Sequence, residues 1–486
     1  MEENVKRTAL SNIFWKFLER IIAQGISLVV SIVIARILTP DDYSVVALVN
    51  IFFNFANVII SGGLNTSLIQ KKDSDGLDYS SVLFVSLAIS IVLYVLLFFL
   101  APAISSFYSN PLITPVLRVM GLSLPISAIK SIWCAYISSK LQFKKFFFAT
   151  LIGTIVSGIV GITMALKGFG PWALVAQQII NLFIDTVVLI CCARINLVLK
   201  ISFARLKRLF GFGWKILAAN LIGTFYSEIS PLIVGIKFSQ QDLSFYTKGR
   251  SFPNMLSTAT TSTLSAVLFP ILTKKKESKE IILKYTRLFI RISSFVVFPL
   301  MLGFFAVAED FVLIFLTEKW IQSVFYIRIF CLCSMFDIIA IGNCETIKAI
   351  GKSDVYLLIE IIKKSLYFVT ILLFVLFAQS PQVVACASLT CVIVQICINS
   401  IPNIKLIGYD LSSQVSDILP GLLISVAMCL FVFLIGLAMP SGSVVGFISK
   451  IFLGAVFYFA FSYLFNKRTL KYIKEAILSL KKRGTK

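Results

Sequence analysis

The sequence predicts an all-α integral membrane protein, and three observations support that prediction. The mean hydropathy is +0.93, with 58% hydrophobic and only 14% charged residues, whereas soluble domains are about 45–50% apolar and about 25% charged. Apolar runs long enough to cross a bilayer, which takes roughly 17–25 helical residues, recur along the whole chain. Basic residues also gather in alternate loops, as in multi-pass membrane proteins.

Fourteen apolar segments are predicted to span the membrane as helices. With residues 1–12 placed in the cytoplasm, 28 of the 45 Lys and Arg residues fall in cytoplasmic segments and four in outer loops, so both termini are predicted to be cytoplasmic. The segment 309–322 is apolar only in its middle and is predicted to form an interfacial turn of helix. The predicted spans are 13–37, 43–63, 79–101, 115–139, 147–166, 171–193, 209–236, 245–270, 285–308, 323–347, 355–378, 382–403, 415–439 and 443–465.

The composition also excludes several functions. The net charge of +22 is explained by basic loops that face anionic lipid, so no nucleic-acid partner is expected. The chain has no His, which rules out a His-based triad or His metal ligands. Most of the ten cysteines lie within predicted spans, where Cys acts as a small apolar residue. We therefore expect no metal, no disulfide and no cofactor.

An internal repeat with an offset of about 200 residues organises the chain. Trp15-Lys16 and Trp214-Lys215 each open a long span, and Asp42-Tyr43 corresponds to Asp242 and Tyr246. Six spans separate the two copies, so both enter the membrane from the same side, which predicts two parallel six-helix lobes around a central cavity. The predicted divisions are a cytoplasmic leader (1–12), an N-lobe (13–194), a basic linker (195–208), a C-lobe (209–407), two extra C-terminal helices (408–465) and a basic cytoplasmic tail (466–486).

Polar side chains recur at steps of three and four residues along the first two helices of each repeat, so that they share one helix face. Such stripes either join helices through hydrogen bonds or line a water-filled cavity. Their place in equivalent helices of both lobes favours the cavity. The predicted cavity-lining residues are Lys16, Gln24, Asn50, Asn54, Asn57, Asn220, Thr224, Asn254 and Thr258.

The charges within the spans predict an anionic ligand. We count 13 Lys and Arg there against six acids, namely Glu19, Asp185, Glu228, Asp337, Glu345 and Glu360. An unpaired charge in the membrane costs at least about 2.5–3.5 kcal/mol, so excess cations suggest a ligand that brings phosphate or diphosphate. The candidate contacts are Arg20, Lys215, Arg250, Arg287 and Arg291.

Several motifs resemble the Wzx-like polysaccharide flippases of the multidrug/oligosaccharidyl-lipid/polysaccharide exporter superfamily. They include Ala35-Arg36-Ile37-Leu38-Thr39-Pro40 through Asp42-Tyr43, Gly170-Pro171-Trp172 and Lys248-Gly249-Arg250-Ser251-Phe252-Pro253. The resemblance covers nearly the whole chain and is weakest after about Pro381. Ser44 and Ser61 depart from the pattern, standing where a Gly and an acid are common.

The resemblance implies a flippase, not an enzyme. Such proteins move undecaprenyl-diphosphate-linked oligosaccharide from the cytoplasmic to the outer leaflet of the bacterial inner membrane by alternating access. The product is lipopolysaccharide O-antigen, capsule or exopolysaccharide. Membrane lipids, a polysaccharide polymerase and a chain-length regulator are the expected partners. Coupling to H⁺ or Na⁺ would use an intramembrane acid, for which Glu19, Asp185 and Glu228 are the candidates.

Two other functions stay open at this point. A cation-coupled multidrug antiporter of the same superfamily would use Asp185, Glu228 and Asp337, although the positive balance disfavours cationic cargo. A membrane-embedded glycosyltransferase or polymerase would need paired acids with a metal or a large catalytic loop. No outer loop exceeds about 17 residues, which disfavours an enzyme.

Overall fold

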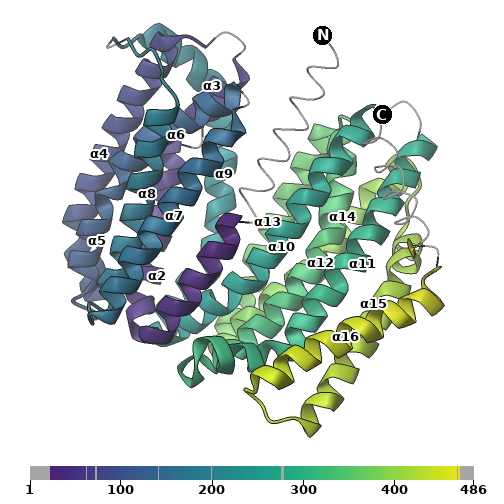
Figure 1. Ribbon diagram of the computed structural model, residues 1–486. Coiled ribbons are helices and arrows are strands. Elements are labelled where there is room, and N and C mark those ends of the chain that lie inside the picture. The colour runs from purple at the N-terminus through teal and green to yellow at the C-terminus, as the bar shows by residue number, and fades with distance from the viewer. Residues whose placement is uncertain are drawn as a thin grey trace. The chain divides into compact units, whose positions relative to one another are not determined.

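The computed structural model describes residues 22–470 apart from positions 62, 72–73, 141, 199, 275–278 and 468. These residues are helical almost throughout and include no strand, as the sequence predicts (Figure 1). After a helical segment over 22–37, the helices are α2 (Pro40–Ser61), α3 (Leu64–Gln70), α4 (Gly76–Phe107), α5 (Ile113–Gly121), α6 (Ser123–Ser139), α7 (Phe143–Leu166), α8 (Pro171–Cys192), α9 (Phe203–Lys237), α10 (Gln240–Lys274), α11 (Lys279–Phe311), α12 (Ser323–Ala349), α13 (Ser353–Phe377), α14 (Pro381–Ile407), α15 (Leu411–Ala438) and α16 (Val444–Phe465).

Eleven segments among the described residues are long and apolar enough to cross a membrane, and a twelfth, Ile22–Ile37, is apolar but shorter. Helices α10 and α13 are also long, at 35 and 25 residues, but their polar and charged residues keep them outside that set. The chain is thus a multi-pass membrane protein, and the count of fourteen spans stays a prediction. The turn expected within 309–322 instead extends α11 through a π-helical turn, Val312–Leu316.

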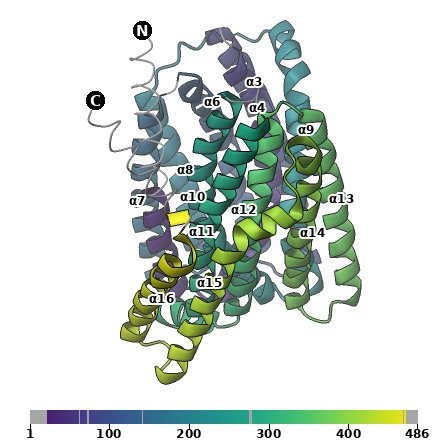
Figure 2. The same ribbon diagram turned by 90° about the vertical axis from the view of Figure 1, so that its right-hand side faces the viewer.

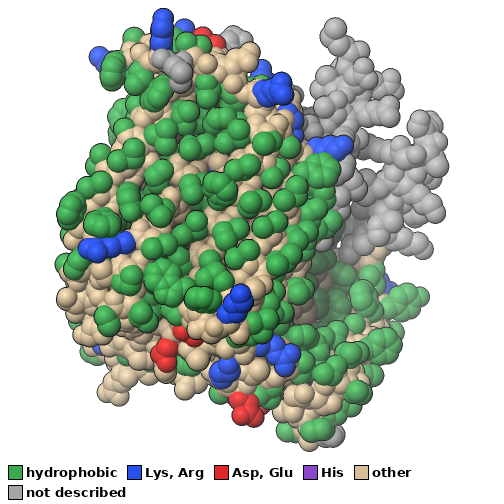
Figure 3. Space-filling model, turned by 60° about the vertical axis from the view of Figure 1, so that its left-hand side comes forward, with side chains coloured by type: hydrophobic (Ala, Val, Ile, Leu, Met, Phe, Trp, Pro, Cys, Tyr) green, Lys and Arg blue, Asp and Glu red, His purple; other side chains and the backbone are tan. Residues whose placement is uncertain are grey.

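Hydrophobic side chains cover the surface that lipid would contact. Figure 3 shows a broad apolar surface that few charged side chains interrupt. On α4, Val92 and Phe99 are 64% and 74% exposed, which a water-soluble protein would avoid in so large a patch. The outward-facing side chains are therefore suited to hydrocarbon.

The chain divides into two compact units, Met1–Ser244 and Phe245–Lys486. Helix α9 lies in the first unit, where it packs against α2, α3 and α4, whereas the sequence places 209–236 in the second lobe. The contact brings backbones together, because a Cβ on Gly63 would lie 2.5 Å from the carbonyl oxygen of Gly213. The division into six-helix lobes stays a prediction.

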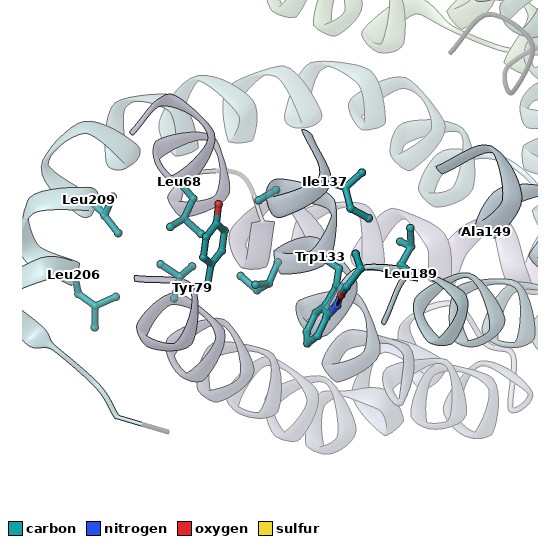
Figure 4. Close-up of a cluster of buried hydrophobic side chains, with 12 residues drawn as sticks. Leu68, Tyr79, Trp133, Ile137, Ala149, Leu189, Leu206 and Leu209 are labelled. Carbon is teal, nitrogen blue, oxygen red and sulfur yellow. Dashed lines mark hydrogen bonds between the residues drawn. The ribbon is translucent and has the colours of Figure 1, made fainter. Parts of the chain in front are cut away.

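A hydrophobic core in the first unit fixes one end of its helices (Figure 4). Leu68 of α3, Tyr79 of α4, Trp133 of α6 and Leu189 of α8 are buried together there. The Trp133 indole N–H donates to the carbonyl oxygen of Ala193 at 2.9 Å, which satisfies a buried polar group. This core ties the chain segment after α8 to the body of the unit.

The two copies of the predicted repeat have the same local geometry where α2 and α10 begin. The hydroxyls of Thr39 and Ser239 donate to the carboxylates of Asp42 and Asp242 at 2.8 and 2.7 Å, and each acid also accepts the backbone N–H of its partner. The two helix starts are joined by a hydrogen bond from the Gln241 amide to Asp41 at 2.8 Å. Side chains that satisfy free N–H groups at a helix start stabilise it.

The start of α4 is held by charge. Asp75 and Asp78 form a reciprocal capping box, and Arg205 of α9 contacts Asp75 at 2.5 Å and Asp78 at 3.4 Å. The hydrogen bond from Arg205, followed by the backbone N–H of Asp78, lowers the pKa of Asp75 to about 2. The backbone N–H of Val198 donates to Ser80 at 2.9 Å, so the basic linker is attached to this helix start.

In the second unit, α11 packs against α12, α15 and α16, and Figure 2 shows these helices together. The Lys450 ammonium of α16 contacts Asp310 of α11 at 2.6 Å, and both side chains are about 95% buried. The Tyr458 hydroxyl donates to the carbonyl oxygen of Phe295 at 2.8 Å. The two extra C-terminal helices are therefore attached to α11 by buried polar contacts as well as by apolar packing.

Candidate functional site

An arginine–aspartate cluster, consisting of Arg287, Arg291, Asp417 and Tyr409, joins α11 to the start of α15. Arg287 donates from Nε and Nη2 to the two carboxylate oxygens of Asp417, both at 2.8 Å. Arg291 donates from Nε to Oδ1 of Asp417 at 2.9 Å and also from Nη2. Because Arg287 and Arg291 are four residues apart, they project from one face of α11.

Within the cluster, two guanidinium groups share one carboxylate, which leaves one excess positive charge. The exposed Asp410, which caps α15, acts on Arg287 from outside the cluster. The Asp417 side chain is fully buried, whereas those of Arg287 and Arg291 are 36% and 22% exposed. Each guanidinium uses its Nε and Nη2 on Asp417 and so retains Nη1 for another acceptor. Paired arginines of this kind suit phosphate oxygens, which they bind through charge-assisted hydrogen bonds.

Tyr409 completes the cluster from the turn between α14 and α15. Its hydroxyl donates to Oδ2 of Asp417 at 2.9 Å. Burial, together with the charge of Asp417, raises the pKa of Tyr409 well above its usual range, so the phenol stays protonated and donates at any physiological pH. The Arg287 guanidinium carbon lies 5.9 Å from the centre of the Tyr409 ring.

Sequence reasoning missed Asp417, which the count of six intramembrane acids leaves out. The residue lies inside the predicted span 415–439, and an acid buried in a span needs a cationic partner, so its position was a usable signal. The identity of the partners was not predictable, because helical spacing relates residues of one helix only.

The other predicted cationic contacts are distributed differently. Lys215 is exposed on α9, and Arg250 is half-buried on α10 with its guanidinium carbon 5.9 Å from the ring centre of Phe330. Arg20 lies outside the described residues, as do Lys16 and Glu19. Within the part of the chain that the structure describes, Arg287 and Arg291 are the two predicted contacts that a shared partner brings together.

The predicted polar stripes of α2 and α9 meet in the first unit. The Asn54 amide donates to Oε1 of Glu228 at 3.1 Å, and Asn57 accepts from the Ser127 hydroxyl of α6 at 2.6 Å. Asn220 is exposed and Thr224 is half-buried on α9. Glu228 makes no ion pair with any described residue, so its charge is met there by hydrogen bonds alone.

Asp185, another candidate coupling acid, is already neutralised. It forms an ion pair with Lys130 of α6 and is almost completely buried on α8. A second intramembrane acid, Glu360, pairs with Lys363 one turn later on α13. An acid in contact with a resident ammonium is poorly placed to bind a coupling ion, because that ion would have to displace the lysine.

The remaining predicted cavity residues are accessible but scattered. Gln24 and Asn50 are half-buried in the first unit. Asn254 and Thr258 are exposed on α10 in the second unit, and the Thr258 hydroxyl donates back to the Asn254 carbonyl oxygen at 2.5 Å. Their exposure allows contact with water or a polar ligand.

Comparison with known proteins adds a family and a fold. A family model described as polysaccharide biosynthesis protein matches residues 33–325. The chain is 23% identical over 315 residues to the succinoglycan biosynthesis transport protein ExoT of Rhizobium meliloti (strain 1021), covering 65% of this chain and 64% of that protein. It is 20% identical over 353 residues to the lipopolysaccharide biosynthesis protein WzxC of Escherichia coli (strain K12), covering 70% and 69%.

Among solved structures, the fold is similar to that of the lipid II flippase MurJ in an inward closed conformation. The TM-score is 0.75 at 15% sequence identity, and the alignment covers 95% of this chain and 100% of that one. At this identity the likeness establishes the fold alone. The match to the succinoglycan protein spans less than two thirds of that protein's length, while the family model covers more than half of this chain.

Proposed function

We propose that this chain, which belongs to the polysaccharide biosynthesis protein family, is a flippase for lipid-linked oligosaccharide in the bacterial inner membrane. The cargo would be an undecaprenyl-diphosphate-linked repeat unit, moved from the cytoplasmic to the outer leaflet by alternating access. The relative named as a succinoglycan biosynthesis transport protein and the similarity of the fold to that of a lipid II flippase support this function. Both termini would lie in the cytoplasm, and a polymerase and a chain-length regulator would act on the product.

The single observation that favours an anionic cargo is the excess charge of the arginine–aspartate cluster. Sugars and a diphosphate cannot cross hydrocarbon unaided, because each unsatisfied polar group costs several kcal/mol there. The exposed edges of Arg287 and Arg291 offer donors to phosphate oxygens. The polyprenyl tail would remain in lipid and need no polar contact.

The position of the cluster along α11 suits capture from the cytoplasmic leaflet. Arg287 and Arg291 lie nine and thirteen residues into α11, which is roughly 12 and 18 Å from its predicted cytoplasmic end at 1.5 Å per residue. Asp417 lies seven residues into α15, at a comparable depth. A diphosphate that leaves the headgroup region would reach these arginines within the first half of α11, with Asn254 and Thr258 as contacts for sugars.

Neutralising both arginines tests the proposal. In a deletion strain, the wild-type gene should restore lipid-linked oligosaccharide to the outer leaflet, whereas R287Q/R291Q should leave it inside at normal protein level. R118Q is the matched control, because Arg118 is a span cation that contacts the Phe98 ring at 4.2 Å and pairs with no carboxylate among the described residues. Normal export by R287Q/R291Q would refute the assignment of these residues.

Ion coupling, if present, is proposed to use Glu228. Asp185 is already paired with Lys130. Glu228 instead accepts a hydrogen bond from the Asn54 amide and contacts no cation among the described residues. E228Q should then abolish any dependence of export on a proton or sodium gradient, and D185N should lower protein stability. A gradient-dependent E228Q variant would contradict this assignment. The same residue is the strongest feature in favour of a cation-coupled antiporter.

A further inference from the structure

The start of α15 brings an acid to the two arginines and is itself held rigidly. Gln414 donates from Nε2 to the carbonyl oxygen of Tyr409 at 3.3 Å. Its Oε1 accepts from the Asn343 amide and the Ser400 hydroxyl, both at 2.9 Å. These side chains are buried, and buried polar groups that are satisfied this way fix a local structure. The turn bearing Tyr409 and the first turns of α15, which carry Asp417, are therefore held to α12 and α14.

Asp417 sets the orientation of both guanidinium groups. Without it, two like charges one helical turn apart would repel each other, as such pairs do on helices. Each long arginine side chain would also have many rotamers to lose on binding a ligand. With it, four N–H groups are directed onto one carboxylate, so the free edges of the two guanidinium groups are positioned in advance.

Asp417 is less accessible to a ligand than the two arginines that contact it. Its side chain is fully buried, while Arg287 and Arg291 remain partly exposed. A phosphate group that binds at the Nη1 groups would leave the contacts of Nε and Nη2 to Asp417 in place. The acid would thus support ligand binding and would not compete with it.

From this geometry we infer that Asp417 is a positioning residue, which preorganises Arg287 and Arg291 to bind a diphosphate group. The inference rests on the proposed function and deepens it. The two C-terminal helices are then part of the ligand-binding apparatus, because α15 supplies the acid that orients the arginines. The ligand class is a pyrophosphate-type anion, whose two charged groups match two guanidinium groups.

Pyrophosphate binding to the purified full-length chain tests the inference, with inorganic pyrophosphate as the probe and calorimetry as the readout. D417N raises the net charge of the cluster by one, so a purely electrostatic role predicts tighter binding. Loss of orientation predicts the reverse, and we expect the affinity of D417N to fall about tenfold, the effect of one lost charge-assisted hydrogen bond.

D310N is the matched control, because Asp310 also ties α11 to the C-terminal helices through a buried ion pair and lies outside the cluster. Both variants should lower the unfolding temperature, but D310N should bind pyrophosphate like the wild type. Y409F removes only the hydroxyl that contacts Asp417 and should weaken binding about threefold. It keeps the test decisive should D417N fail to fold.

Unchanged or tighter binding by D417N or Y409F would overturn the inference, as would equal weakening by D310N. Absence of pyrophosphate binding by the wild type would overturn it too. Measuring which leaflet displays lipid-linked oligosaccharide in cells distinguishes failure of the positioning role from failure of the proposed function. If the wild type exports lipid-linked oligosaccharide while D417N binding is unchanged, the flippase stands and the positioning role fails. If the wild type exports none, the flippase fails, and the binding series still decides the role of Asp417.

Discussion

Replacing Asp310 by Asn tests how firmly α16 is held to the rest of the second unit. The Asp310–Lys450 contact is 2.6 Å and both side chains are about 95% buried, so D310N leaves an ammonium without its counter-charge. Removing one partner of a buried ion pair costs about 3–5 kcal/mol. Asn still offers an oxygen to the Gly442 N–H, which Asp310 now accepts at 3.1 Å, so the loss is specific to Lys450.

A double variant separates the charge from the packing. D310N/K450M removes both charges while keeping side-chain length, and replacing a buried pair by apolar groups is often neutral or stabilising. We therefore expect D310N/K450M to be about as stable as the wild type and D310N to be much less stable than either. The assay is thermal unfolding in one detergent, combined with hydrogen exchange to locate the loss in α16. The reasoning would be refuted if D310N lowered the free energy of unfolding by less than about 1 kcal/mol, which is the most that an exposed salt bridge usually contributes. It would also be refuted if the double variant were less stable than D310N.

Two further predictions concern the first unit. G63A should abolish folded protein, because the added Cβ would lie 2.5 Å from the Gly213 carbonyl oxygen. G25A is the control and should express normally, because a Cβ there would have nothing within 4 Å. Equal yields of the two variants by fluorescence-detected gel filtration would contradict this packing. The pKa of Asp75 is lowered to about 2, below its unfolded value of about 3.9, so its contribution to stability is present above about pH 4 and lost as pH falls toward 2. Unfolding temperatures of wild type and D75N should converge over that range, and a constant difference would count against the Asp75–Arg205 contact.

The sequence was sufficient for the fold class because hydropathy and loop charge are properties of single segments. The long helices from α2 to α16 overlap the predicted spans, although α3 matches none of them and the predicted span 115–139 is divided into α5 and α6. The Thr39–Asp42 and Ser239–Asp242 pairs repeat at an offset of 200 residues. The extent of α11 differed, since Phe311 leads into a π-helical turn. Periodicity alone does not distinguish such a turn from an interfacial segment.

The candidate site was only half predictable. The spacing of Arg287 and Arg291 placed them on one face of a helix, but nothing local indicated that both would bind Asp417, about 130 residues further along the chain. The same holds for Lys130 with Asp185. Contacts between distant helices depend on how helices pack, which is decided by many side chains at once.

The measurement that tests the central claim most directly is the leaflet location of the lipid-linked oligosaccharide in a deletion strain. A membrane-impermeant lectin or glycosidase would report what is displayed outside. The proposed flippase predicts linked oligosaccharide trapped inside, restored to the outer leaflet by the wild-type gene and not by R287Q/R291Q. Normal outward display in the deletion strain, with altered sensitivity to cationic drugs, would contradict a flippase and favour the antiporter.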